Sequence, residues 1–124
     1  MVAMAELMRA WSVERPGPLA TLPLAVVRRA IPEPGPGEVL VRVLTCGVCR
    51  TDLHVTLGEL PVHRHGVTPG HEIVGVVEAA GPGSDRFRIG DRVGVPWLRR
   101  TCGHCRWCRG GRENLCAEST STGW

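Results

Sequence analysis

The 124-residue sequence is poor in aromatic residues and nearly balanced in charge. It has no tyrosine, one phenylalanine and a net charge of +3 at pH 7, and its arginines are scattered. Proteins that bind nucleic acids usually combine clustered basic residues with aromatic side chains that stack on bases. No apolar run reaches the roughly 20 residues that span a bilayer. The composition therefore predicts a protein that binds neither nucleic acid nor membrane.

Two further signals are absent. The N-terminus has neither the basic region nor the apolar core of a secretory signal. The glycine motif of dinucleotide-binding folds, G-x-G-x-x-G between a strand and a helix, is also missing. Gly35 and Gly37 precede a predicted strand instead of following one, and after Gly81 and Gly83 the third position is Arg86. We therefore expect a cytoplasmic chain with no Rossmann domain.

Cysteine, by contrast, is abundant. Four of the six cysteines have the spacing C-x2-C-x2-C-x7-C, and we call them the four-cysteine cluster: Cys102, Cys105, Cys108 and Cys116. Structural zinc takes four thiolates tetrahedrally, and gaps of two residues let neighbouring cysteines reach one ion. Arginines surround the cluster and would offset its negative charge: Arg100, Arg106, Arg109 and Arg112.

Two other interpretations of these cysteines compete with zinc. Disulfides need an oxidising compartment, and no export signal is present. A bacterial iron–sulfur run ends in C-x3-C-P, which the sequence lacks. The spacing therefore predicts a structural-zinc lobe over residues 98–117.

Short predicted strands separated by turns follow one another along the chain. They cover residues 8–13, 22–29, 38–45, 73–80 and 87–95, the last with a turn at Gly90 and Asp91. Residues 50–57 predict a short helix that ends at Gly58, and residues 59–68 predict an exposed loop. Such a series of strands is typical of an all-β barrel.

A second group of chemically capable side chains lies in the middle of the chain. Cys49 ends one predicted strand, and His71 and Glu72 begin another. Catalytic zinc sites use three protein ligands and keep one position open. Residue types alone favour the alternative in which Cys49 is a small buried apolar residue and His71 a satisfied strand-end histidine. Likewise, Thr51 and His54 could be a proton path or polar surface on one helical turn.

Three motifs in order resolve these alternatives by resemblance. They are Gly47-Val-Cys49-Arg-Thr-Asp-Leu-His54, then Gly70-His-Glu72 followed by Gly75 and Gly81, then the four-cysteine cluster. Together they resemble the zinc-dependent alcohol dehydrogenases of the medium-chain dehydrogenase/reductase family. The resemblance implies a mainly β, GroES-like and partly open barrel over residues 8–124. The barrel would be incomplete and would carry the zinc lobe, with residues 1–7 as an N-terminal extension.

The resemblance also implies the metal ligands. Cys49 and His71 would bind a catalytic zinc ion, and the four-cysteine cluster would hold a structural one. Glu72 would act at the catalytic site, where it and Asp52 would lie behind the ligands, a position from which carboxylates orient ligating imidazoles.

Further roles concern substrate and cofactor. Thr51 would accept the proton of a small alcohol and pass it towards His54 through the ribose of NAD or NADP. Arg50 would contact the cofactor pyrophosphate, which suits guanidinium geometry. Trp97 stands where the family often places a wall of the substrate pocket.

The resemblance covers only part of the family pattern. The third catalytic ligand is a cysteine downstream of the lobe, and the sequence stops before it and before the cofactor domain. We therefore expect a fragment that does not oxidise alcohols alone, and NAD-dependent turnover by the pure chain would contradict this. Exposed strand edges would favour self-association, and homo-oligomers are possible by family analogy.

Several alternatives stay open. Cys46 and Cys49 form a C-x2-C pair, so Cys46 could be a small buried residue, a substitute third zinc ligand or part of a redox pair. The whole protein could be another zinc dehydrogenase, of polyol or formaldehyde type. A non-catalytic, zinc-stabilised β module is the alternative from a different class.

Overall fold

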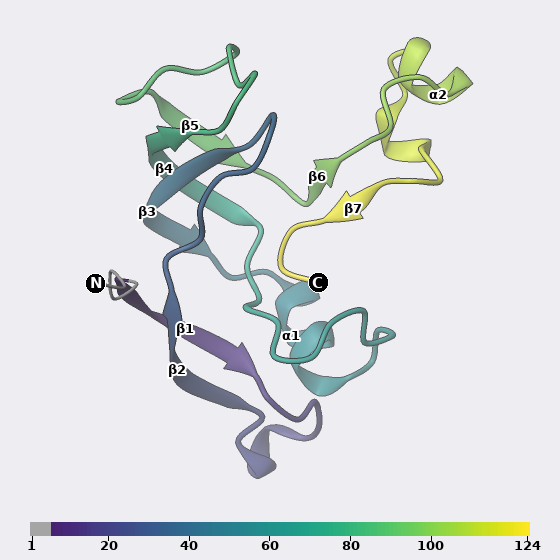
Figure 1. Cartoon of the computed structure of the whole chain (residues 1–124). Coiled ribbons are helices and arrows are strands. Elements are labelled where there is room, and N and C mark those ends of the chain that lie inside the picture. Colours follow the sequence, from purple (N-terminus) through teal and green to yellow (C-terminus); the bar gives the residue numbers. More distant parts are fainter. Residues whose placement is uncertain (1–5) are drawn as a thin grey trace.

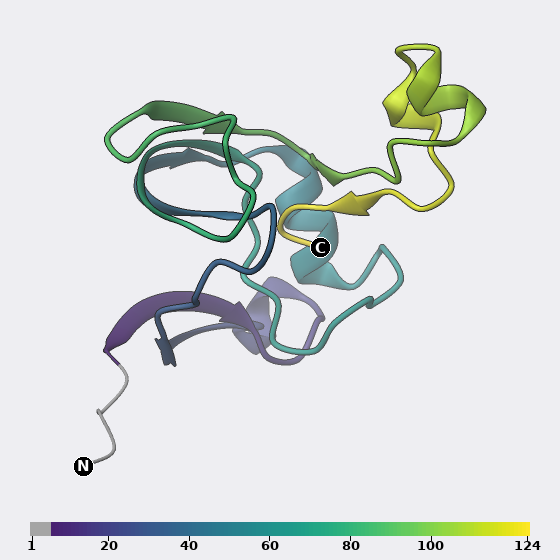
Figure 2. The ribbon, with the colours of Figure 1, turned by 45° about the horizontal axis from the view of Figure 1, so that its top comes forward.

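The described part of the chain is mainly β and consists of small sheets arranged around one helix (Figure 1). The computed structural model describes residues 6–124, and residues 1–5, most of the predicted extension, lie outside the described residues. Two views show the zinc-lobe segment projecting away from the remaining elements (Figures 1 and 2). No helix among residues 6–124 is long and apolar enough to cross a membrane.

The first sheet is a two-stranded antiparallel hairpin. Strand β1 (Leu7–Val13) pairs with β2 (Leu24–Ala30), and the 3-10 helix η1 (Leu19–Thr21) lies between them. The prediction started β2 two residues too early. Leu22 has a left-handed φ of 52° and is followed by Pro23, which lacks an N–H, so neither residue extends the ladder.

The second sheet carries the strongest predicted strands. Strands β3 (Val39–Gly47), β4 (Glu72–Ala80) and β5 (Arg92–Val95) are antiparallel in the order β3-β4-β5. The predictions for β3 and β4 are confirmed to within two residues. At Gly81 a Cβ would lie 1.9 Å from the carbonyl oxygen of Gly35. The two backbone segments are so close here that no residue larger than glycine fits.

The prediction for residues 87–95 is correct for the turn at Gly90 and for the strand after it, and wrong for the residues before the turn. Residues 92–95 form β5, but the preceding residues form a turn. Gly90 has a φ of 95°, and the N–H of Arg88 donates to Asp91 Oδ2 over 2.8 Å. The aspartate side chain therefore satisfies backbone groups that a strand would have paired across the sheet.

Helix α1 (Arg50–Leu57) begins directly after β3 and confirms the prediction. Cys49 caps its first turn in a capping box with Asp52, and Gly58 ends it with a φ of 77°. The helix packs on the described hydrophobic core, in which Val55 meets Val13 and Val67. The capping box matters for function because it fixes two candidate ligand side chains.

The lobe is bounded by a third small sheet. Strands β6 (Leu98–Arg100) and β7 (Thr120–Ser121) pair antiparallel and lead into and out of α2 (Arg106–Arg109) and the 3-10 helix η2 (Glu113–Leu115). The sequence did not predict β6, β7 or these two helices. The three sheets remain separate, which confirms the expected open and incomplete barrel.

Candidate metal centres

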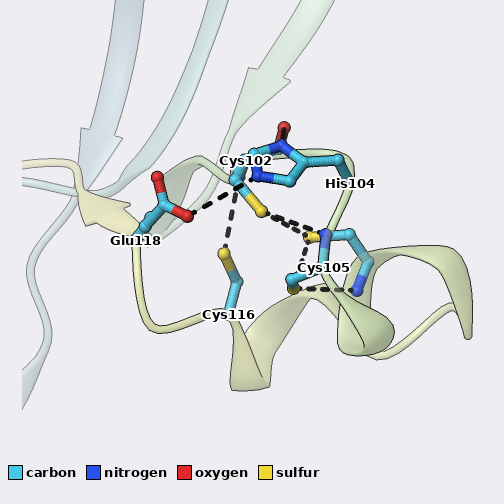
Figure 3. A network of polar contacts seen from close by, with 6 residues as sticks. Cys102, His104, Cys105, Cys116 and Glu118 are labelled. Carbon is cyan, nitrogen blue, oxygen red and sulfur yellow. Dashed lines mark hydrogen bonds and ion pairs between the residues drawn. The ribbon is translucent and has the colours of Figure 1, made fainter.

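The sulfur atoms of the four-cysteine cluster lie close together in the lobe, and Figure 3 labels Cys102, Cys105 and Cys116. All lie within 4.8 Å of one another, and Cys108 Sγ is 3.9 Å from Cys102 Sγ and 3.5 Å from Cys105 Sγ. Zn–S bonds of about 2.3 Å place tetrahedral sulfurs about 3.8 Å apart. A disulfide would need about 2.05 Å, and all six cysteines are free. The spacing therefore suits a metal ion.

Backbone amides support this arrangement of the sulfur atoms. The N–H of Cys105 donates to Cys102 Sγ over 3.3 Å, and the N–H of Cys108 donates to Cys105 Sγ over 3.5 Å. The N–H of Cys102 donates to Cys116 Sγ over 3.4 Å. The first two bonds follow from the gaps of two residues, because each sulfur lies near the backbone N–H three residues further along the chain. Backbone hydrogen bonds lower the pKa of Cys102 and Cys105 and so favour the thiolate, the form that binds metals.

Two of the predicted arginines lie on an indole ring. The guanidinium carbons of Arg106 and Arg112 are 4.2 Å and 4.8 Å from the centroid of Trp107. Such cation–π contacts fix charge at a defined place. Positive charge is thus held on the lobe, where it offsets the charge of the thiolates.

The cysteines of the lobe differ in acidity. Hydrogen bonding from the backbone N–H of Cys108 lowers the pKa of Cys105 to about 7. The backbone N–H of His104 is the main cause that lowers the pKa of Cys102. Burial raises the pKa of Cys108 to about 11. Cys105 therefore loses its proton well before Cys108.

A second cluster joins the start of α1 to the start of β4. Cys49 Sγ lies 3.1 Å from His71 Nε2, and Asp52 Oδ1 lies 3.2 Å from His71 Nδ1. Asp52 and His71 are only 7% and 8% exposed. Asp52 Oδ2 also accepts the N–H of Cys49 over 2.9 Å, and Cys49 Sγ accepts the N–H of Thr51 over 3.2 Å. We call Cys49, Asp52 and His71 the buried cluster.

The carboxylate sets the tautomer of the imidazole. Asp52 Oδ1 and His71 Nδ1 are close but not aligned as a regular hydrogen bond, and neither atom has another partner among the described residues. A proton on Nδ1 faces the carboxylate and leaves the Nε2 lone pair directed at Cys49 Sγ. A carboxylate behind a ligating histidine is the usual support of a metal site. The buried cluster therefore fits a cation between sulfur and nitrogen.

The structure does not bring all predicted residues into this cluster. Glu72 is exposed and its carboxylate lies beside Gly47, so Asp52 alone of the two predicted carboxylates contacts His71. Cys46 is exposed, is 3.4 Å from the carbonyl oxygen of Gly47, and joins no described cluster of potential ligands.

The remaining predicted residues surround the cluster. Arg50 is exposed at the first turn of α1, and Thr51 contacts Cys49 through its backbone N–H. His54, one turn later, pairs through Nδ1 with the carboxylate of Glu59. Trp97 packs edge-on against His71, with ring centroids 4.9 Å apart.

Sequence reasoning missed the aromatic residues behind Trp97. Trp124 stacks on Trp97 at 5.5 Å and on His63 at 3.8 Å between centroids, and its Nε1–H donates to the carbonyl oxygen of Pro61. The row of rings ties the loop after α1 to the histidine of the buried cluster. The only available signal was the use of tryptophan in a chain otherwise poor in aromatics.

The fold and the two clusters define the class: an open β module with two separate sets of metal-ligand side chains. Comparison with known families gives the identity. The family model of the alcohol dehydrogenase GroES-like domain matches residues 35–124. The chain belongs to this family.

Relatives with similar sequences are alcohol dehydrogenases by name. Over 122 residues the chain is 57% identical to "Probable alcohol dehydrogenase AdhA" of Mycobacterium tuberculosis, covering 94% of this chain and 35% of the relative. It is 48% identical over 103 residues to an alcohol dehydrogenase of Geobacillus stearothermophilus, covering 82% of this chain and 31% of the relative. The chain thus spans about a third of the length of these curated relatives.

A solved structure shows the same fold. The cobalt- and zinc-bound thermostable alcohol dehydrogenase of Pyrobaculum aerophilum matches with a TM-score of 0.84 at 38% identity. The match covers 95% of this chain and 37% of that protein. The predicted GroES-like fold is therefore confirmed.

Proposed function

We propose that this chain forms the zinc-binding part of an NAD(P)-linked alcohol dehydrogenase that acts on small alcohols and aldehydes. The observation that carries the proposal is the buried cluster, in which a thiol, an imidazole and a carboxylate meet although they come from separate segments. A purely structural module has no use for a buried, ionisable group of this kind, because burying it costs free energy. The names of the relatives support the same reaction.

The two clusters have different proposed roles. The four-cysteine cluster offers four sulfurs, which fill the coordination of a structural zinc ion. The buried cluster offers only Cys49 Sγ and His71 Nε2 at the shared face, which suits a catalytic ion with positions left for other ligands. The cobalt and zinc named for the Pyrobaculum enzyme support a metal of this type.

The chain's own residues prepare the catalytic ligands. The Asp52 carboxylate, 3.2 Å from His71 Nδ1, favours a proton on that nitrogen, which leaves the lone pair on Nε2. The N–H of Thr51 donates to Cys49 Sγ and fixes the position of this sulfur. Zinc, when bound, supplies Lewis acidity that lowers the pKa of an alcohol hydroxyl.

Proton transfer and substrate binding involve α1 and Trp97. The Thr51 hydroxyl would take the alcohol proton, and His54 lies one turn along the same helix. The Glu59 carboxylate pairs with His54 Nδ1 and leaves Nε2 free to exchange protons with solvent. Trp97, braced by Trp124, forms an apolar wall beside His71. Arg50 at the first turn of α1 is available to the cofactor pyrophosphate.

Cofactor and location complete the proposal. NAD or NADP would accept the hydride, and because the 124 residues contain no dinucleotide motif, additional polypeptide would bind it. Solved relatives include one bound to NADP and one complexed with NADH. The free thiols favour a reducing cytoplasm.

A chimera tests the function. Residues 6–124 would replace the matching part of the Geobacillus stearothermophilus alcohol dehydrogenase, and NAD(P)H formation would be followed with a panel of small alcohols, polyols and formaldehyde adducts. We expect turnover with small alcohols and a loss of at least about 10³-fold for His71→Ala, because a ligand that stabilises developing charge is removed. His65→Ala, an exposed histidine outside the metal-ligand clusters, is the control. A folded, zinc-loaded chimera without turnover would favour the non-catalytic module.

A further inference from the structure

A third group of potential ligands lies on the outside of the lobe. Cys102, His104 and Glu118 each offer one atom, and the three atoms lie within 4.8 Å of one another. Figure 3 shows the His104 ring and the Glu118 carboxylate meeting beside Cys102, at the rim of the four-cysteine cluster. Neither His104 nor Glu118 has a role in the proposed dehydrogenase reaction.

The imidazole of His104 is oriented as a metal ligand would be. Its Nδ1 lies 2.9 Å from the carbonyl oxygen of Cys102, which can only accept a hydrogen bond, so Nδ1 carries a proton. The neutral ring then has its lone pair on Nε2, which faces Glu118 Oε1 at 3.9 Å. A histidine that donates one ring N–H to a backbone carbonyl and presents the other nitrogen is the common arrangement at metal sites.

The distance between His104 Nε2 and Glu118 Oε1 is longer than in a hydrogen-bonded ion pair. An imidazolium Nε2–H that donates to a carboxylate settles at about 2.7–2.9 Å. At 3.9 Å the two atoms are too far apart for a hydrogen bond. Ligand bonds of about 2.1 Å to one tetrahedral ion would hold nitrogen and oxygen roughly 3.4 Å apart. The observed 3.9 Å is closer to this spacing than to that of a hydrogen-bonded ion pair, and His104 and Glu118, 77% and 68% exposed, are accessible to an ion from solvent.

We propose that His104, Glu118 and Cys102 form an accessory site for a divalent transition metal ion such as Zn²⁺ or Co²⁺. The mixture of imidazole nitrogen, carboxylate oxygen and thiolate sulfur suits such ions better than Mg²⁺ or Ca²⁺, which prefer oxygen. The Cys102 sulfur is shared with the four-cysteine cluster and bridges the two ions, and water completes the coordination. The second cation reduces the negative charge of a tetrathiolate that the nearby arginines only partly offset.

Metal counting on the 124-residue protein tests the site. The zinc-loaded protein is titrated with Co²⁺ and, separately, with Zn²⁺, and bound ions are counted by native mass spectrometry and equilibrium dialysis. At metal concentrations that fill the site in the unaltered protein, that protein should bind one more ion than His104→Ala or Glu118→Gln. In each variant the affinity for this ion should fall at least about tenfold. Ions bound at Cys49 and His71 are common to all forms and cancel in the difference.

Matched controls separate this site from nonspecific surface binding. His65→Ala and Glu33→Gln remove an exposed imidazole and an exposed carboxylate elsewhere, and both should keep the extra ion. Equal numbers of bound ions in the unaltered protein and in His104→Ala would overturn the proposal. The contact between His104 and Glu118 would then be an ion pair only. Loss of the tightly held zinc in His104→Ala would also overturn it, because His104 would then support the lobe itself. Neither result would bear on alcohol oxidation by the chimera.

Discussion

Replacing Cys108 by serine should remove the tightly bound zinc and unfold the lobe. Cys108 Sγ lies within 3.9 Å of two other cluster sulfurs, so its loss opens the coordination on one side. Zinc binding supplies about 10–16 kcal/mol in small structural sites, and the lobe has little hydrophobic core, because Cys116 is its only buried residue between residues 98 and 121. We expect at least 100-fold weaker zinc binding and loss of amide protection over residues 98–121. Zinc content and hydrogen exchange measure the two effects.

Cys46→Ser is the matched control for this experiment. Cys46 is exposed and belongs to none of the described ligand groups. Its replacement should leave zinc content and exchange unchanged, which would dispose of the hypothesis that it is a substitute zinc ligand. If Cys108→Ser kept its zinc while Cys46→Ser lost it, the assignment of the four-cysteine cluster would be wrong.

Removing His71 should abolish the second, weaker metal site. His71→Ala takes away the imidazole nitrogen that lies 3.1 Å from Cys49 Sγ, so we expect no ion to be held there. Asp52→Asn keeps the size of the side chain but loses the carboxylate behind the imidazole, and metal affinity should fall about 10–100-fold. Cobalt titration followed by absorption of the thiolate-bound ion distinguishes the two losses.

Asp52 also supports the helix, and this second role needs its own control. Its Oδ2 accepts the N–H of Cys49, so Asp52→Ala should lower the free energy of unfolding by about 1–3 kcal/mol even without metal. Glu72→Gln should change neither stability nor cobalt affinity, because Glu72 is exposed and outside the cluster. If Glu72→Gln weakened cobalt binding as much as Asp52→Asn, the position given to Asp52 would be contradicted.

The contrast between Asp52 and Glu72 shows what sequence reasoning could reach. Both carboxylates were predicted to lie behind the zinc ligands. Glu72 follows His71 at the start of a strand, and neighbouring side chains of a strand point to opposite faces. Asp52 follows Cys49 by three residues on a helix, and that spacing returns its side chain to the cap. Helical spacing therefore predicted contact with the buried cluster better than adjacency in sequence did.

Other elements were predictable to the extent that their signals were local. The alternation of residues 38–45, the glycine that ends α1 and the cysteine spacing each depend on a few neighbouring residues, and the structure reproduces each element. The β6–β7 pair joins segments about twenty residues apart, and neither is long enough to show a period. Trp124 reaches His63 and Trp97 only through the tertiary fold, so no local pattern could indicate these contacts.

The number of zinc ions per chain, measured by native mass spectrometry after excess metal is removed, tests the central claim most directly. The account predicts one tightly held ion, present in Cys46→Ser and absent in Cys108→Ser. A chain that is folded but contains no zinc would contradict the assignment of the four-cysteine cluster, on which the structural zinc and the accessory site both depend.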